Sequence, residues 1–537
     1  QEDVFSIEST LTQLYGFGFD IRWRNLFIGL QPKKVELPTY PYQTQSFWID
    51  KIRLGQYSNN QWANMTGDCY QLQWQPLPLT QKLSDRDIDT ERHQVQHDAL
   101  KHIVLIGKPS PVIREIEKKA SCPVSVITLG DISIEPSLAS LLSENPASHV
   151  VYLADSDADK VELIDSVYQQ TETLLAIHNV MQSRGEQVDA ERGKLWLITQ
   201  RCHQVKLDSG QNDIASLNLT SYPLLGLSKS IALESTENWG GVIDVSGVNV
   251  DSENASGALS ESIIAEISGA AEEDCVSLVV CDNGANAPEG ENIAIQRYVQ
   301  RLHKNNGMLN EAKSLKESNA VDAEAVYLVT GGLGALGLQV ARRLAENGAA
   351  HLVLVSRNGQ RETLNVEQLA HIDAIEACGA DVTIRNIDIS DTKQTTVLIN
   401  DISATRPLKG IVHAAGISDI CLLDAMTSEK FRRITQSKIE GGWNLHSATQ
   451  SSDLDFFLVF SSIASVWGSG GMAHYAAGNQ FLDGLVRYRK SLGLPASSVN
   501  WGPWKGSGMA QGDAEVEASK RGLQPLNPEE GLSIVEA

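Results

Sequence analysis

The sequence predicts an α/β protein made of two Rossmann-like, doubly wound halves that follow an extended N-terminal linker. Three observations predict this fold class. Short apolar segments alternate with helical segments over most of the 537 residues, as in doubly wound sheets. One apolar segment, residues 325–330, runs into a glycine cluster with G-x-G-x-x-G spacing and then into a helical pattern. The earlier half shows the same alternation without such a cluster, so we expect a structural half followed by a catalytic half.

Composition excludes several protein classes. No apolar run approaches the roughly 18 residues that span a bilayer, and the start Gln1-Glu2-Asp3 lacks the features of a secretory signal. The formal net charge of −23 argues against nucleic acid as a partner. Seven cysteines without a C-x-x-C pair predict reduced thiols and no metal site. We therefore expect a cytoplasmic protein that binds neither membrane nor nucleic acid.

Residues 1–65 are expected to be a linker rather than a domain. Residues 37–48 combine prolines, which stiffen an extended path, with four large aromatic rings that can lie on another surface.

Residues 66–320 are predicted to form the structural half. Its first strand is followed by Gly107-Lys108-Pro109-Ser110-Pro111, which has no glycine fingerprint, so we expect no dinucleotide there. Strands are predicted at 102–107, 124–129, 149–153, 194–199, 241–245 and 276–280, and helices at 158–184, 224–235 and 292–304.

Residues 321–537 are predicted to form the catalytic half. The chain stops inside an apparent helix at 528–537, which indicates a piece of a longer polypeptide. Strands are predicted at 325–330, 351–355, 381–387, 410–413, 455–461 and 496–501, with helices between them, as in a Rossmann sheet.

The glycine cluster predicts a dinucleotide site. Glycine permits the tight turn and lets backbone N–H groups approach a pyrophosphate at a helix N-terminus. Arg357 lies twenty residues beyond Gly337, where NAD-binding proteins carry an acidic residue; an arginine accommodates a 2′-phosphate instead. The predicted cofactor is therefore NADPH. The residues assigned to it in this region are Thr330, Gly331, Gly332, Leu333, Gly334, Leu336, Gly337, Ser356 and Arg357.

Polar groups gather where the fifth strand of the catalytic half ends and the next helix begins. Ser462 ends the strand, and Tyr475 and Asn479 open the helix, near the expected nicotinamide. A phenol with a pKa near 10 needs a nearby cation for proton transfer at neutral pH. Short-chain reductases commonly place a lysine four residues after the tyrosine, but Asn479 stands there. Any cation must come from elsewhere in the chain.

These motifs resemble the ketoreductase (KR) domains of modular type I polyketide synthases, within the short-chain dehydrogenase/reductase superfamily. In that family the lysine and asparagine have exchanged places. Lys438 lies 24 residues before Ser462, and Ser462 lies 13 before Tyr475, as in the family. The resemblance covers residues 70–537, and residues 37–48 are similar to the segment that follows acyltransferase domains. The matching segments are Phe460-Ser461-Ser462-Ile463-Ala464-Ser465, Tyr475-x-x-x-Asn479-x-Phe481-Leu482-Asp483 and Ser437-Lys438-Ile439-Glu440-Gly441.

The resemblance implies reduction of a β-ketoacyl thioester carried by an acyl carrier protein, with acyltransferase and ketosynthase domains as neighbours. NADPH supplies hydride, Tyr475 the proton, and Ser462 a hydrogen bond to the same oxygen. Lys438 lowers the phenol's pKa, and Asn479 orients Lys438 or a water. Further cofactor contacts are implied at Asp388, Ile389, Ala414, Ala415, Gly416, Pro503 and Trp504, with a mobile lid over residues 505–522.

The configuration of the alcohol is also implied. Relatives of one type carry Leu-Asp-Asp after the fourth strand, whereas this chain carries Ser418-Asp419-Ile420. Relatives of the other type carry a tryptophan eight residues before the tyrosine, where Trp467 stands. Met472 replaces the histidine that marks enzymes acting on epimerised substrates. We expect an A-type enzyme that forms an L-hydroxyl without an epimerised α-methyl, and we interpret His474 as a loop residue.

Two alternatives remain open. A non-reducing scaffold would be expected to lose the tyrosine, the asparagine or the glycines, which are all present. Another short-chain enzyme, such as a sugar-nucleotide epimerase, is disfavoured by the missing lysine and by the fingerprint-free first half. A solvated face is the favoured interpretation of five basic residues, with docking of the carrier as the alternative: Arg432, Arg433, Arg487, Arg489 and Lys490.

Overall fold

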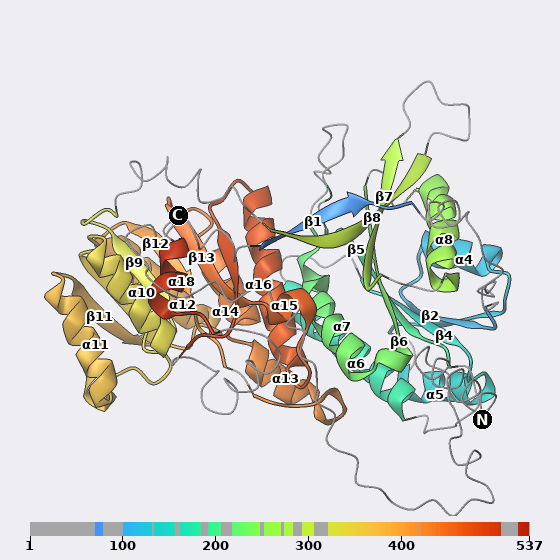
Figure 1. The fold of residues 1–537 in the computed structure, drawn as a ribbon, viewed down its shortest axis with the longest axis horizontal. Coiled ribbons are helices and arrows are strands. Elements are labelled where there is room, and N and C mark those ends of the chain that lie inside the picture. The colour runs from blue at the N-terminus through green and yellow to red at the C-terminus, as the bar shows by residue number, and fades with distance from the viewer. Residues whose placement is uncertain are drawn as a thin grey trace, which may run out of the picture. The chain divides into compact units, whose positions relative to one another are not determined.

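Two largely parallel β-sheets, each covered by helices, make up the described part of the chain (Figure 1). The predicted linker at 1–65, the lid segment 506–522 and Ser418 lie outside the described residues. No helix within the described ranges combines the length and apolar character that a membrane span requires. The computed structural model describes residues 70–78, 100–130, 134–155, 162–183, 192–203, 205, 217–247, 252–269, 273–282, 293–304, 321–417, 419–505 and 525–535.

The first sheet has eight strands in the order β1-β8-β7-β6-β5-β4-β2-β3. Strands β2 to β7 are parallel, and β8 and β1 add an antiparallel edge. Helices α4 and α8 cover one face and α5, α6 and α7 the other. The bounds are β1 Tyr70–Pro76, β2 Ile103–Gly107, α4 Pro111–Lys119, β3 Val124–Thr128, α5 Ile134–Glu144, β4 His149–Leu153, α6 Leu163–Gln182, β5 Leu195–Gln200, α7 Tyr222–Glu234, β6 Trp239–Gly247, α8 Glu253–Ser268, β7 Cys275–Asp282 and β8 Ile293–Lys304.

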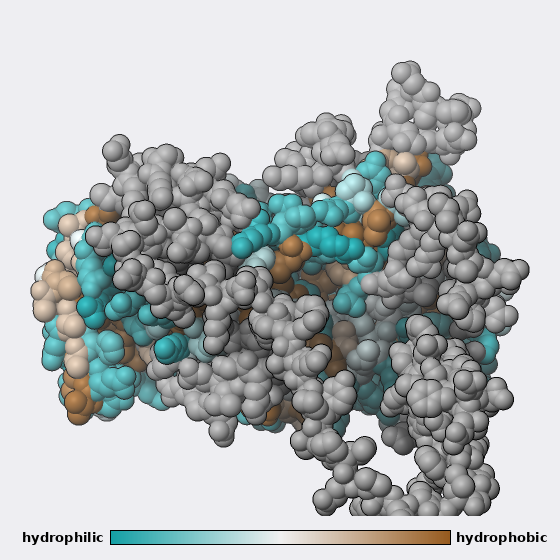
Figure 2. All heavy atoms as spheres, in the orientation of Figure 1, coloured by the Kyte–Doolittle hydropathy of each residue, from teal (hydrophilic) through white to brown (hydrophobic). Residues whose placement is uncertain are grey.

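The prediction of a helix at 292–304 is wrong, because this segment is strand β8. It pairs antiparallel with β7 on one side and with β1 on the other. Tyr298 and Val299 are buried, and Ile293 and Ile295 pack against the core. Two neighbouring strands therefore decide the conformation of a segment whose own pattern is ambiguous. At the outer edge the glutamines of β1 are exposed, and Figure 2 shows hydrophilic residues over β1 and β8.

The second sheet has six parallel strands in the order β11-β10-β9-β12-β13-β14, the doubly wound arrangement predicted for the catalytic half. Helices α10, α11 and α18 cover one face, and α12, α14 and α16 cover the other. The bounds are β9 Val326–Thr330, α10 Ala335–Glu346, β10 His351–Ser356, α11 Val366–Ala377, β11 Asp381–Asn386, α12 Thr392–Thr405, β12 Leu408–His413, α13 Ser428–Thr435, α14 Ile439–Ala448, β13 Phe456–Ser462, α15 Ala464–Trp467, α16 Ala473–Ser491, β14 Ser497–Trp501 and α18 Pro528–Val535.

The two halves differ at their first turns. In the second sheet a glycine turn joins β9 to α10, and Gly334 begins that helix without a side-chain cap. In the first sheet Ser110 precedes α4, and its side chain accepts a hydrogen bond from the backbone N–H of Ile113. The start of α4 is thus occupied by the protein's own hydroxyl.

Helix α7 of the first half packs against α15 and α16 of the second (Figure 1). The helices approach closely at two glycines. A Cβ on Gly226 would lie 2.4 Å from the carbonyl oxygen of Ala476, and one on Gly484 would lie 2.4 Å from Cγ of Tyr222. One hydrophobic cluster runs through this contact, from Leu224 in α7 to Phe481 in α16. The two sheets therefore share a core.

Candidate functional site

The glycine turn between β9 and α10 is built around close backbone contacts. Gly331 has a φ of +67°, and a Cβ there would lie 2.8 Å from the backbone nitrogen of Ala415. A Cβ on Gly337 would lie 2.2 Å from the carbonyl oxygen of Gly331. Gly334 is exposed at the start of α10. The turn thus presents an uncapped helix N-terminus to solvent, as a pyrophosphate requires.

The other residues predicted in this turn support it from within. Thr330 is fully buried, and its hydroxyl is 2.7 Å from Nδ1 of His413 at the end of β12. Leu333 is buried and Leu336 half-buried. Gly332 lies against Leu354, since a Cβ there would lie 2.9 Å from the Cβ of Leu354. These residues hold the turn on the neighbouring strands.

Arg357 stands beside the turn with its charge exposed. It follows Ser356, the half-buried last residue of β10. Within the part of the chain that the structure describes, no ion pair is formed by Arg357. The guanidinium is therefore available to an anionic ligand.

Two further segments predicted to bind the cofactor follow β11 and β12. The carboxylate of Asp388 accepts hydrogen bonds from the backbone N–H and hydroxyl of Ser390, so its orientation is fixed. Ile389 is buried against Gly441. Ala414 and Ala415 are half-buried and Gly416 is exposed. These residues follow the carboxyl ends of the strands, on the side of the sheet where the glycine turn lies.

The segment after β14 places its predicted cofactor residues differently from the segments after β11 and β12. The ring of Trp504 is buried, with its centroid 4.6 Å from that of Trp501. Backbone hydrogen bonds join Pro503 and Lys505 to Leu526. Any contact from Trp504 to a cofactor must therefore come from its backbone, while Pro503 stays half-buried.

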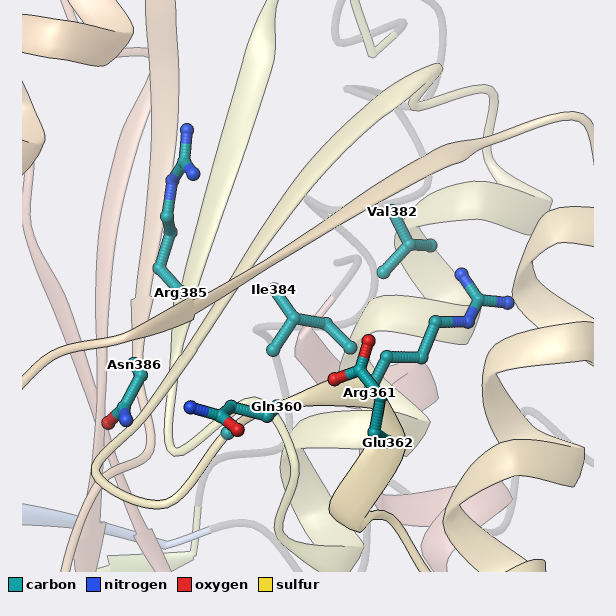
Figure 3. Close-up of a pocket in the computed structure, with 8 residues that line it drawn as sticks. Gln360, Arg361, Glu362, Val382, Ile384, Arg385 and Asn386 are labelled. Carbon is teal, nitrogen blue, oxygen red and sulfur yellow. The ribbon is translucent and has the colours of Figure 1, made fainter.

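A cavity of about 400 Å³ lies beside the outer strand β11 (Figure 3). Its lining includes Gln360, Arg361 and Ile384, and none of the residues predicted for catalysis. The guanidinium of Arg361 is held by both carboxylate oxygens of Glu376. This cavity is therefore separate from Lys438, Ser462 and Tyr475.

Lys438, Ser462 and Tyr475 come from three different elements and meet at the carboxyl end of the second sheet. Lys438 precedes α14, Ser462 ends β13, and Tyr475 lies in the first turn of α16. The buried Nζ of Lys438 is 5.8 Å from the ring centroid of Tyr475 and donates a hydrogen bond of 3.0 Å to the carbonyl of Phe460. The lysine from the earlier helix therefore lies close to the phenol.

Burial acts on both groups. It raises the pKa of Tyr475, while hydrogen bonding to Ser462 and to Asn479 acts in the opposite direction. Burial lowers the pKa of Lys438 to about 8, and the charge of Asp483 offsets part of that effect. Lys438 is thus still mostly charged at neutral pH, next to a phenol whose proton is held firmly.

Asn479 lies in α16, one turn after Tyr475. Its Nδ2 donates to the carbonyl of Tyr475 at 2.8 Å, and its buried Oδ1 has no hydrogen-bond partner among the described residues. Lys438 passes the same helix at Gly478, where a Cβ would lie 3.4 Å from Cδ of the lysine. An acceptor on the helix that Lys438 contacts is thus left for a water or a ligand.

Asp483 is a functional candidate that the sequence reasoning left without a role. Its carboxylate accepts hydrogen bonds from Ser465, Ser498 and the side chain of Asn500. Asp483 thus holds the residues around Ser462 in place, and its charge favours the charged form of Lys438. The spacing of Tyr475, Asn479 and Asp483, at i, i+4 and i+8 on one helix face, is the signal that could have identified it.

The residues predicted to control configuration lie on the loop that follows β12 and on the segment from the end of α15 to the start of α16. Trp467 ends α15 and is 46% exposed, and half-buried Met472 precedes α16. Asp419 is exposed and pairs with Lys430 and Arg433. The N–H of Cys421 donates to the carbonyl of Gly471, which joins the two loops.

Two interpretations of surface residues are wrong. His474 lies in α16 and is fully buried, not in a loop, and burial lowers its pKa to about 4. Arg489 is also fully buried; its guanidinium lies 4.1 Å from the Phe457 ring centroid and donates to the carbonyl of Pro495. Its charge therefore cannot dock a partner. Arg432 is engaged with Glu440.

Comparisons with known protein sequences place the chain among polyketide synthases. Residues 325–506 match the family model of the KR domain. The pikromycin polyketide synthase component PikAIII of Streptomyces venezuelae is 28% identical over 98% of this chain, which spans 29% of that protein. A phenolphthiocerol/phthiocerol polyketide synthase of Mycobacterium tuberculosis is 32% identical over 73% of this chain and 20% of its own length. The chain thus spans less than a third of these relatives.

The solved structures that resemble this chain are also ketoreductases. The structure of an A1-type ketoreductase is 27% identical, with a TM-score of 0.67 over 88% of this chain and 90% of the other. The structure of A-type ketoreductases from a modular polyketide synthase matches with the same values. Both sheets are included in a match of this extent.

Proposed function

Since the chain belongs to the ketoreductase domains of modular type I polyketide synthases, we propose that it reduces a β-ketoacyl thioester to the β-hydroxyacyl thioester with NADPH. The observation that carries the proposal is the meeting of Lys438, Ser462 and Tyr475 beside the glycine turn. When bound, the cofactor supplies hydride to the carbonyl carbon.

The residues of the turn fit an anionic dinucleotide. The backbone N–H groups in the first turn of α10 have no side-chain cap, and a side chain at Gly331 or Gly337 would fill the space that the turn needs. The exposed guanidinium of Arg357 would pair with a 2′-phosphate, which favours NADPH over NADH.

Proton transfer would come from Tyr475. Its hydroxyl donates the proton to the developing alkoxide, and the hydroxyl of Ser462 donates a hydrogen bond to the same oxygen. The charge of Lys438 favours the phenolate that remains. Asn479 would hold a water beside Lys438 through its unpaired Oδ1, and this water restores the proton.

The substrate is proposed to arrive on the phosphopantetheine arm of an acyl carrier protein, with acyltransferase and ketosynthase domains in the same polypeptide. The long polyketide synthases among the relatives support this. Trp467 and the loop of Asp419 favour an A-type, L-configured hydroxyl without an epimerised α-methyl, in accord with the A1-type structural relative.

Chiral analysis of the alcohol made from a racemic 2-methyl-3-ketoacyl thioester tests the proposal. We expect an L-hydroxyl product with NADPH, a much lower rate with NADH, and loss of turnover in Y475F with NADPH binding retained in a fluorescence titration. A protein that binds NADPH without reducing the thioester would contradict the activity. Exclusive D-hydroxyl product would contradict only the assignment of configuration.

A further inference from the structure

Glu234, the last residue of α7 in the structural half, binds two loops of the catalytic half. One carboxylate oxygen accepts from the backbone N–H of Leu423 at 2.9 Å and the other from that of Gly471 at 2.8 Å. The first N–H belongs to the loop that follows β12 and carries Asp419. The second belongs to the loop that precedes α16 and leads to Met472. A single side chain therefore fixes both loops.

The same helix also supports the turn that carries Trp467. Lys229 donates to the carbonyl of Ser465 at 2.5 Å and to the side chain of Gln480 at 3.2 Å. The hydroxyl of Ser230 donates to the carbonyl of Ser469 at 3.2 Å and accepts from its N–H at 3.4 Å. The turn on both sides of Trp467 is thus bonded to α7.

The charge of Glu234 suits this geometry. A carboxylate offers two acceptor oxygens, and its hydrogen bonds with N–H groups are charge-assisted. A glutamine in its place keeps one acceptor but directs an NH₂ group at the second N–H. One of the two loops would then lose its bond and leave a backbone N–H unpaired.

We propose that Glu234 is a positioning residue for stereoselectivity, through which the structural half helps decide which face of the ketone receives hydride. The inference rests on the proposed function, because it concerns the configuration of that reaction's product. Glu234 acts on the two loops and not on the reacting atoms. Its loss should therefore change product configuration before it changes cofactor binding.

The test is E234Q in the full chain, assayed with the racemic 2-methyl-3-ketoacyl thioester and NADPH. We expect the ratio of L- to D-hydroxyl product to fall about tenfold, the size expected for one lost charge-assisted hydrogen bond. The dissociation constant of NADPH should change less than about twofold, because Leu423 and Gly471, to which Glu234 is bonded, are not among the residues assigned to the cofactor. S230A should shift the product ratio in the same direction, by less.

E237Q is the matched control. Glu237 is exposed three residues further on, so the variant makes the same charge change without touching either loop. The wild-type product ratio in both E234Q and S230A would overturn the inference; if E234Q does not fold, the ratio in S230A decides alone. Absence of any reduction by the wild-type chain would instead contradict the proposed function.

Discussion

Lys438 destabilises the fold in which it is proposed to work. Burial lowers its pKa from the ordinary 10.5 to about 8. At neutral pH the ammonium group of Lys438 is charged in both states, but water solvates it better in the unfolded chain. This difference lowers the free energy of unfolding by an amount on the order of 3 kcal/mol. The bond to the Phe460 carbonyl offsets part of this cost. A buried cation whose desolvation is only partly offset is a feature that selection for stability alone would not favour.

We therefore predict that K438M abolishes reduction and leaves the protein at least as stable as the wild type at pH 7. Between pH 8 and 10.5 the unfolded lysine keeps a proton that the folded one has lost, so wild-type stability rises with pH in this window. The difference in free energy of unfolding between K438M and the wild type should therefore decrease by about 3 kcal/mol across this window. Urea unfolding of both proteins at pH 7.5 and pH 10 measures this difference.

K490M is the control for this prediction, because Lys490 is exposed at the end of α16. It should give the same stability difference from the wild type at both pH values. The account of Lys438 would be contradicted if K438M had a free energy of unfolding more than about 2 kcal/mol below that of the wild type at pH 7, and if the difference between the two proteins did not change toward pH 10.

At the residue scale, the sequence was informative where spacing along one element decides geometry. Tyr475 and Asn479 lie on one helix, and Lys438 and Ser462 lie near them, as the motif spacings indicated. It was misleading where packing between elements decides. Arg489 lies among charged neighbours in the sequence, but α16 turns it inward onto Phe457. No local pattern contains that information.

At the scale of elements, the strand–turn–helix unit of β9 and α10 depends on glycines for two separable reasons. Gly337 is required by packing, because its Cβ would lie 2.2 Å from a carbonyl oxygen. Gly334 is exposed, and a Cβ there would approach the Gly331 carbonyl only to 3.2 Å. Packing therefore excludes a side chain less strictly at Gly334, and we attribute its bare backbone mainly to the proposed dinucleotide.

We predict that G337A lowers both stability and NADPH affinity, whereas G334A lowers NADPH affinity at least about tenfold with a stability loss below about 1 kcal/mol. Thermal unfolding and fluorescence titration separate the two effects. G257A in α8 is the control, since its Cβ would meet only Nζ of Lys119 at 3.4 Å. Wild-type NADPH affinity in G334A would show that the pyrophosphate does not approach this turn.

Element prediction succeeded where a strand lies inside a parallel sheet and failed at the antiparallel edge. The parallel strands are continuous buried apolar runs, such as Ile103–Gly107, which are visible in the sequence. The antiparallel strand Ile293–Lys304 mixes buried and exposed positions irregularly, so its own periodicity does not separate strand from helix. Pairing with β1, which is distant in the chain, decides it.

At the scale of the whole molecule, the two sheets are joined by a core that neither half completes alone. Residues of α6 and α7 and residues of α14 and α16 belong to one hydrophobic cluster. The buried face of α16 also carries the residues next to Tyr475. The structural half therefore supports the catalytic groups through packing as well as through Glu234.

We predict that residues 65–535 unfold in one cooperative transition and that G484A lowers the stability of both halves together. Its Cβ would lie 2.4 Å from Cγ of Tyr222, so α7 and α16 must separate, at a cost of about 1–3 kcal/mol. Calorimetry should show a single peak that moves to lower temperature in G484A, with reductase activity lost at the same temperature. Two peaks, of which G484A moves one, would mean that the halves fold independently despite the shared cluster.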